Sequence, residues 1–346
     1  MSEIVRAIDV GYGQTKYVAT AGERSIRCDQ FPSVAAISEH TAKRDAIGGT
    51  RKTVALAING ITYEVGPDVH LVGRPYPARK MDDGYYQTPE HLALIRGALA
   101  YMNVEAVHLL VLGLPVHIFK QKGTAQSLKK RVKGEHDVGD GRTVRVEDVQ
   151  VVAQPSGALV CFGAIERRMA DLRSEKSLII DAGARTFDWL VTQGMRVVEG
   201  ASNSVARGMH DVLRELARGL ARDVGVEVSD LDRIDRALRS GTNPKFMGTE
   251  RSLSKHLRTA KAITDDAVAE MKHYVGNGHD IDNIVLGGGG AFFFLDAIAR
   301  EFPGRQVRVL DDAVYANVRG FQIAGMDLGG VRPARTSAVE APVGAE

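Results

Sequence analysis

The chain has 346 residues, of which 44% are hydrophobic and 25% are charged, a composition typical of a globular protein long enough for two hydrophobic cores. Its formal net charge of +2 is too small for a protein whose main task is to bind nucleic-acid phosphates, so no direct DNA binding is expected. The two cysteines lie far apart, and no leader-like or membrane-spanning stretch is found, which predicts a cytoplasmic protein that does not engage a membrane.

The chain opens with a predicted β-hairpin. Residues 4–9 are apolar and favour a strand, the turn Gly11-Tyr12-Gly13 follows, and residues 14–20 form the returning strand. Residues 24–83 are more polar and contain a second hairpin signal at Asn59-Gly60. We interpret this stretch as an inserted subdomain.

A helix, two strands and a second helix are expected next. Thr88-Pro89-Glu90 predicts a helix start, because Thr88 can cap the helix and Pro89 suits its first position. Residues 107–112 and 144–152 are expected to be strands. Pro155-Ser156-Gly157 is expected to open the second helix.

The strand expected at residues 177–181 starts a second copy of the opening pattern. Asp181 is followed by Ala182-Gly183, as Asp9 is followed by Val10-Gly11, and the two aspartates are 172 residues apart (181 − 9). The sequence therefore predicts two α/β domains of similar design, at residues 1–160 and 161–330.

The second half is expected to carry an insertion of its own. Residues 209–274 are strongly charged with helical periodicity, which predicts a helical insertion. A strand is expected at residues 281–286, with helices at 291–301 and 313–326. Residues 331–346 are rich in Pro, Ala and Gly and are expected to be a disordered tail.

Small residues lie in two of the predicted helices. Ser156, Gly157 and Ala158 fall in one helix, and Ala316 and Gly320 fall in the other. Because such residues allow two helix backbones to approach closely, the two helices are expected to cross and to form a hinge between the domains.

The turn after Asp9 can serve a phosphate in two ways. Glycines at positions 11 and 13 allow backbone N–H groups to approach phosphate oxygens, and the carboxylate can hold Mg²⁺, usually through water. Lys16 could neutralise a β-phosphate. The turn alone does not establish such a site, since Asp-x-Gly is also a common hairpin turn.

Asp181–Asp188 offers the same chemistry again, with small residues, a hydroxyl at Thr186 and a carboxylate at each end. Two such loops, one in each domain, could clamp a polyphosphate and its metal from opposite sides. Gly287–Gly290, between a strand and a helix, would let the backbone pass close to a base and ribose. Three glycine motifs in this order, rather than any one of them, indicate a nucleotide site.

The order of the motifs resembles the five-motif signature of the actin-fold ATPases, over nearly the whole chain. Within that superfamily the chain is most similar to the ParM/StbA-type plasmid-segregation actins. The resemblance implies an actin-like, ribonuclease H-like α/β fold, in which two pseudo-symmetric domains with inserted subdomains surround a nucleotide cleft. The motifs are Asp9–Lys16, Gln154–Gly157, Asp181–Asp188, Gly287–Ala291 and Ala316–Gly320.

The resemblance also assigns roles to individual residues. Asp9 and Asp181 match the family's magnesium-organising aspartates, which act through water, and Gln154 matches the residue that positions the attacking water. Gly208 matches a glycine near the ribose. Asp9, Asp181 and Gln154 are therefore the expected catalytic residues. The expected nucleotide-binding residues are Gly11, Tyr12, Gly13, Gln14, Lys16, Gly183, Ala184, Arg185, Thr186, Gly208, Gly287, Gly288, Gly289 and Gly290.

The second loop departs from the family pattern Asp-x-Gly-Gly-x-Thr. Ala184 replaces the second glycine, and Arg185 follows it. Alanine permits close backbone approach if its φ is negative, so the γ-phosphate contact at this loop stays open. Arg185 could reach the phosphates or could be a solvent-facing loop charge.

The resemblance implies an ATP hydrolase that uses ATP or GTP with Mg²⁺ and forms nucleotide-dependent filaments that move plasmid copies apart. The implied partners are further copies of the chain and a centromere-binding adaptor protein on plasmid DNA. Glutamine is a poor general base, so slow, switch-like hydrolysis is expected. The alternative is a small-molecule kinase of the sugar-kinase type, which would need an additional carboxylate base for which the sequence offers no compelling candidate.

Overall fold

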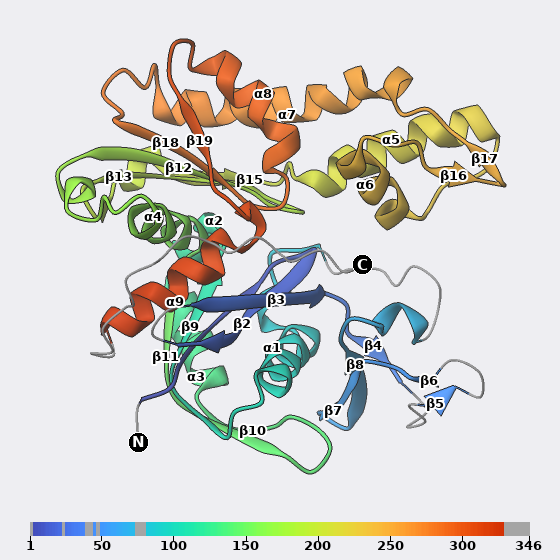
Figure 1. The fold of residues 1–346 in the computed structure, drawn as a ribbon, viewed down its shortest axis with the longest axis vertical. Helices are drawn as coiled ribbons and strands as arrows, with labels where there is room; N and C mark the ends of the chain where they lie inside the picture. Colours follow the sequence, from blue (N-terminus) through green and yellow to red (C-terminus); the bar gives the residue numbers. More distant parts are fainter. Residues whose placement is uncertain (1–2, 23–24, 39–43, 46–48, 73–80, 329–346) are drawn as a thin grey trace.

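The computed structural model describes residues 3–22, 25–38, 44–45, 49–72 and 81–328, and it contains two α/β units (Figure 1). Each unit is built on a mixed sheet, the first sheet below and the second sheet above in Figure 1. The predicted tail at residues 331–346 lies outside the described residues. Among the helices that are described, none is both long and apolar enough to cross a membrane.

The first sheet has the strand order β10-β11-β9-β1-β2-β3. The predicted opening hairpin is confirmed as β1 and β2, which are antiparallel, whereas β1, β9 and β11 run parallel. β3 lies within residues 24–83 and forms the edge of this sheet. The strands are β1 (Val5–Val10), β2 (Gln14–Ala21), β3 (Ile26–Pro32), β9 (Ala106–Leu114), β10 (Gly134–Asp137) and β11 (Thr143–Ala153).

The second sheet repeats this design, as the spacing of Asp9 and Asp181 predicts. Its order is β14-β13-β12-β18-β19, with β15 also paired to β13. β12 and β13 form an antiparallel hairpin, and β12, β18 and β19 run parallel. The strands are β12 (Lys176–Ala182), β13 (Phe187–Gln193), β14 (Arg196–Val197), β15 (Asn203–Val205), β18 (Asn283–Gly287) and β19 (Val307–Val309).

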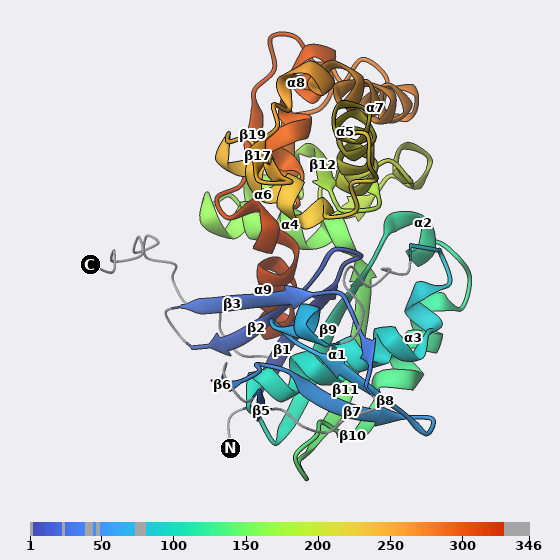
Figure 2. The same ribbon diagram turned by 90° about the vertical axis from the view of Figure 1, so that its right-hand side faces the viewer.

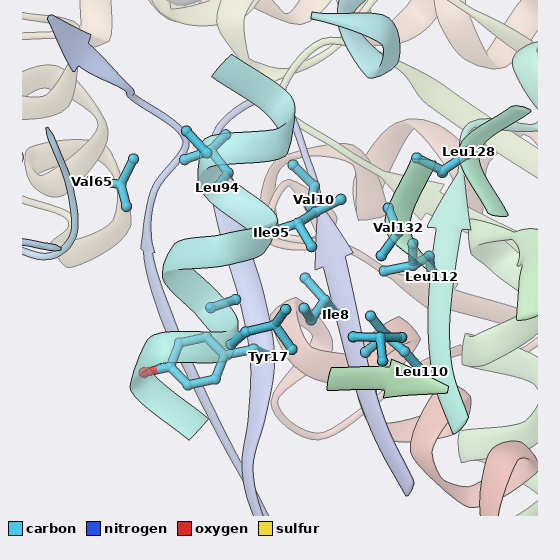
Figure 3. Packing of buried hydrophobic residues seen from close by; sticks show 14 of the residues in the cluster. Ile8, Val10, Tyr17, Val65, Leu94, Ile95, Leu110, Leu112, Leu128 and Val132 are labelled. Atoms are coloured by element: carbon cyan, nitrogen blue, oxygen red, sulfur yellow. The ribbon is translucent and has the colours of Figure 1, made fainter. Parts of the chain in front are cut away.

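Helix α1 (Pro89–Met102) covers one face of the first sheet. Its Leu94 and Ile95 pack with Ile8 of β1 and Tyr17 of β2 in one buried cluster (Figure 3). The predicted cap is confirmed, because the N–H of His91 donates to Thr88 Oγ1 at 3.2 Å. The short helices α2 (Val116–Phe119) and α3 (Thr124–Val132) follow β9.

Each unit carries additional small elements. In the first, β4, β8 and β7 form a three-stranded sheet apart from the main one, and β5 pairs with β6. In the second, the charged stretch 209–274 contains α5, α6 and α7, together with a β16–β17 hairpin that the helical pattern did not predict. These elements are β4 (Ala36–Ile37), β5 (Arg44–Asp45), β6 (Gly49–Thr50), β7 (Val54–Ile58), β8 (Ile61–Val65), α5 (Met209–Val224), α6 (Leu231–Ser240), β16 (Lys245–Phe246), β17 (Thr249–Glu250) and α7 (Ser254–Val275).

Two helices, α4 (Gln154–Ile165) and α9 (Ala316–Leu328), lie between the sheets (Figures 1 and 2). Helix α4 follows β11 of the first sheet but packs on the second, where Phe162 joins Ile179 in a buried cluster. Helix α9 packs on the first sheet, where Phe321 joins Ala7. Each helix therefore covers the sheet of the opposite half of the chain. Helix α8 (Ala291–Glu301) covers the outer face of the second sheet.

The predicted close crossing of these two helices is confirmed. A Cβ atom added to Gly320 of α9 would overlap the carbonyl oxygen of Gly157 in α4. A Cβ added to Gly157 would likewise overlap the carbonyl oxygen of Asn317. The two backbones touch at this point, and both glycines are required by that contact rather than by backbone conformation.

Candidate functional site

The two Asp-led loops form the same turn in each sheet. In the first loop the N–H of Gly11 donates to the Gln14 carbonyl oxygen at 3.2 Å, and in the second the N–H of Gly183 donates to the Thr186 carbonyl oxygen at 2.9 Å. The loops also approach each other, since a Cβ added to Gly13 would lie 2.8 Å from the Cβ of Ala184. The structure thus brings the two predicted loops face to face between the units.

Three buried carboxylates lie at the ends of the loops. Asp9, Asp181 and Asp188 are 1%, 6% and 1% exposed, and they come from the ends of β1 and β12 and the start of β13. Lys16 Nζ lies 3.1 Å from Asp9 Oδ2 and offsets part of this charge. Asp188 Oδ1 accepts the N–H of Val116 at 2.8 Å, which ties the end of β9 to the second sheet.

The crowding of these acids controls their protonation. Burial, followed by the neighbouring carboxylates of Asp188 and Asp9, raises the pKa of Asp181 to about 7, against the opposing influence of Lys16 and a hydrogen bond from Asn317. Burial also raises the pKa of Asp188, although hydrogen bonds from Thr186 and Val116 act in the opposite direction. The three buried carboxyl groups therefore favour the binding of a cation.

Two amide side chains hold the loop aspartates. Gln154, the first residue of α4, donates from Nε2 to Asp9 Oδ1 at 2.7 Å. Asn317, in the first turn of α9, donates from Nδ2 to Asp181 Oδ2 at 2.7 Å. Gly113 makes room for the first amide, because a Cβ there would lie 2.9 Å from Gln154 Cγ.

The sequence motifs pointed to Gln154 but not to Asn317. The signal that could have revealed it is the spacing within the fifth motif. Asn317 stands three residues before Gly320, as Gln154 stands three residues before Gly157.

The glycine run Gly287–Gly290 packs directly against the second loop. Gly288 has φ +87°, and a Cβ there would overlap Asp181 Oδ1, so both conformation and space require glycine. The N–H of Gly290 donates to the Ala182 carbonyl oxygen at 2.8 Å. The Gly289 carbonyl oxygen accepts from Arg239 of α6 at 2.8 Å, whereas Gly287 ends β18 beside Asp181. The run thus joins the second loop to α6.

The N-terminus of α5 also rests on the second loop. The N–H groups of Met209 and His210 donate to the carbonyl oxygens of Gly183 and Ala184 at 3.0 and 2.7 Å. A Cβ added to Gly208 would overlap the Ala184 carbonyl oxygen. Ala184 does not have a positive φ, so alanine fits its backbone conformation in place of the family's second glycine.

The side chain of Arg185 is paired with Asp83 rather than with the buried carboxylates of Asp9, Asp181 and Asp188. Its side chain is 18% exposed, and its Nη1 lies 2.6 Å from Oδ1 of Asp83, a residue of the first unit. Its guanidinium group also lies 5.1 Å from the ring centroid of Tyr12 in the first loop. His117 Nε2 lies 3.3 Å from the same Asp83 oxygen. We call Asp83, Arg185 and Tyr12 the clasp, because they join the two units at the loops.

The residues present fit a hydrated magnesium ion. Such an ion directs the hydrogens of its waters outward and needs acceptors around it, which Asp9, Asp181 and Asp188 supply. Asn317 Oδ1 is a further buried oxygen, and it has no hydrogen-bond partner among the described residues. Within the described part of the chain, no three His, Cys, Asp or Glu side chains are grouped so as to ligate a metal directly.

Comparisons with known proteins agree with this geometry. The family model described as the N-terminal domain of actin-like proteins matches residues 7–157, and the one described as the C-terminal part of MreB-like archaeal actin homologues matches residues 179–300. An archaeal actin homologue of Thermoplasma volcanium is 26% identical over 341 residues, covering 93% of this chain and 98% of the relative.

Solved structures show the same fold. A crystal structure of an archaeal actin homologue superposes with a TM-score of 0.74 at 21% identity, covering 94% of this chain and 99% of the other. The same homologue in complex with ADP gives 0.72 at 19% identity, with the same coverage of both chains. A ParM filament from Clostridium botulinum gives 0.72 at 20% identity, covering 94% of this chain and 100% of the other.

The chain has the two-domain fold of the actin-like ATPases, as the motif order implies. Its sequence is similar to actin-like proteins in both halves, with archaeal actin homologues among its sequence relatives and ParM proteins among its structural neighbours.

Proposed function

We propose that this chain binds ATP or GTP with Mg²⁺ between the loops Asp9–Lys16 and Asp181–Asp188 and hydrolyses it slowly. One observation carries the proposal. Each loop aspartate is held by an amide from a helix that crosses between the units, directly beneath two glycine turns that meet each other. Both units can therefore contact a nucleotide bound between the two loops. The ADP complex of a structural neighbour supports nucleotide binding in this fold.

In this mechanism the protein positions groups and performs no covalent step. Gln154, fixed by Asp9, orients a water for in-line attack on the γ-phosphoryl group but does not take its proton, because a carboxamide does not titrate near neutrality. Backbone N–H groups of the two loops and Lys16 stabilise the charge that develops on the phosphates. A magnesium ion held by the aspartates would supply further charge neutralisation.

We further propose that the nucleotide-bound chain assembles into filaments that move plasmid copies apart in the cytoplasm. The likeness to a ParM filament supports this role. A centromere-binding adaptor protein would connect the filament to plasmid DNA, in agreement with the small net charge of the chain itself. The kinase alternative is not favoured, because both matching family models describe actin-like proteins.

Assembly and hydrolysis can be tested together. The pure protein is incubated with ATP, ADP or no nucleotide, and light scattering, sedimentation and phosphate release are followed in the same samples. We expect polymer with ATP and Mg²⁺ that disappears after phosphate is released. If no assembly depends on nucleotide over a range of salt and magnesium concentrations, the filament function is wrong.

The variant Gln154→Ala should slow phosphate release by about 10²-fold, because the attacking water loses its orientation. ADP binding should be largely unchanged and the polymer should last longer. Gln150→Ala is the control, since Gln150 is exposed on β11 of the same sheet. Phosphate release at the rate of the unmodified protein would remove Gln154 from its assigned role.

A further inference from the structure

The two halves of the chain place an amide residue at corresponding positions. Gln154 and Asn317 each lie in the first turn of a helix that crosses to the other sheet, three residues before the glycine at the crossing point. Each donates to the aspartate at the end of the first hairpin strand of its own half, and both distances are 2.7 Å. Asn317 therefore donates to the loop aspartate of the second sheet as Gln154 donates to that of the first.

The chemistry of the contact fixes how the Asn317 carboxamide is oriented. Its Nδ2 faces Asp181 Oδ2, and when Asp181 is ionised the reverse orientation would place two acceptor oxygens against each other. The opposite atom, Oδ1, is buried in a side chain that is 4% exposed and has no hydrogen-bond partner among the described residues. A buried acceptor without a partner is unfavourable unless another molecule supplies the donor.

We propose that Asn317 is a positioning residue of the nucleotide site, which orients Asp181 through Nδ2 and accepts a hydrogen bond through Oδ1 from the water shell of Mg²⁺. This inference rests on the proposed nucleotide function. It completes the set of acceptors that a hydrated magnesium ion needs, since Asp181, Asp9 and Asp188 supply the others. It also gives the second half of the chain a part in magnesium binding that corresponds to the part of Gln154 in positioning water.

The test measures how strongly Mg²⁺ tightens ADP binding. ADP affinity is determined by calorimetry in EDTA and again at increasing MgCl₂, for the unmodified protein and for Asn317→Ala. Side chains that hydrogen-bond to a metal ligand without contacting the metal typically contribute about 10–100-fold to metal affinity. We therefore expect at least about a tenfold loss of the magnesium effect, with ADP affinity in EDTA nearly unchanged.

Asn283→Ala is the matched control. Asn283 is also buried and donates from Nδ2 to a carboxylate, Glu175 Oε2, at 2.8 Å, but it lies in β18 away from the loops. This variant should keep the magnesium effect even if its thermal stability falls. A purely structural role for Asn317 would make the two variants behave alike.

A second variant keeps the test decisive if Asn317→Ala does not fold. Asn317→Leu keeps the side-chain volume and leaves no unpaired polar atom at this buried position, and it should lose the magnesium effect on ADP as Asn317→Ala does. A magnesium effect that is unchanged in either variant overturns the inference. If the unmodified protein binds no ADP, or binds it without regard to Mg²⁺, the proposed function itself fails.

Discussion

At the scale of single residues, the ionisation of a buried carboxyl group in the site is unfavourable, and a bound cation can offset this. Asp181 ordinarily titrates near pH 3.8, but burial and its two acidic neighbours raise its pKa to about 7. The folded state therefore holds this proton more tightly than the unfolded chain does. The resulting stabilisation is complete below about pH 4 and is lost as the pH rises to about 7. Above that pH, the ionised carboxylate destabilises the protein unless a divalent cation is bound.

The variant Asp181→Asn tests this reasoning. In EDTA and without nucleotide, the melting temperature of the unmodified protein should fall between about pH 4 and pH 7, and the variant should show a flatter pH profile because it has no proton to lose. Differential scanning calorimetry measures both profiles. Asp311→Asn, at an exposed position, is the control and should keep the original profile. An Asp181→Asn profile as steep as that of the unmodified protein would contradict the shifted pKa.

At the scale of elements, the crossing of α4 and α9 joins the chemistry of the site to the packing of the units. The two helices touch at Gly157 and Gly320, and each carries its amide residue three positions earlier. Because the contact is between backbones, a small change in helix separation would displace both Gln154 and Asn317. The same pair of helices thus fixes the distance between the sheets and the positions of Asp9 and Asp181.

Replacing Gly320 with alanine should destabilise the protein, although glycine-to-alanine changes inside helices usually stabilise by about 1 kcal/mol. The added Cβ meets the carbonyl oxygen of Gly157, and overpacking of this kind typically costs about 1–3 kcal/mol. Urea unfolding gives the free-energy change. Gly200→Ala is the control, since a Cβ at Gly200 meets no atom within 4 Å. A Gly320→Ala variant at least as stable as the original would show that the helices can move apart freely.

At the scale of the whole molecule, the clasp joins the two units beside the loops. Arg185 extends from the second loop to Asp83, and its guanidinium group lies on the Tyr12 ring of the first loop. Asp83 is 55% exposed, so the ion pair contributes only up to about 1 kcal/mol to stability. A contact this weak can open and close readily, which suits control of access to the proposed nucleotide site.

The variants Asp83→Ala, Arg185→Ala and the double variant distinguish two roles for Arg185. If the clasp only holds the two units together beside the proposed nucleotide site, all three should release a fluorescent ADP analogue faster by a similar, several-fold factor, with little change in melting temperature. If Arg185 instead binds phosphate, Arg185→Ala alone should weaken binding and Asp83→Ala should not. Stopped-flow dissociation measures the rates. Unchanged release in all three variants would leave the clasp without a function in nucleotide exchange.

The sequence by itself determined the features that depend on neighbouring residues. Apolar runs followed by Asp-x-Gly predicted the opening hairpin and the strand that ends at Asp181, Thr88 and Pro89 predicted the start of α1, and small residues predicted the crossing of α4 and α9. The repeat of the pattern at Asp181 predicted the second α/β unit. These signals are local, because turns, caps and close backbone contacts require particular residue types at fixed spacing.

Only the tertiary structure decided which distant side chains meet. Gln154 and Asp9 are separated by 145 positions, and Asn317 and Asp181 by 136, so their pairing depends on strand order and on the helices that cross between the sheets. The packing of Gly288 against Asp181 and the pairing of Arg185 with Asp83 are equally long-range. No local pattern encodes such contacts, because they depend on how the two sheets pack on opposite sides of α4 and α9.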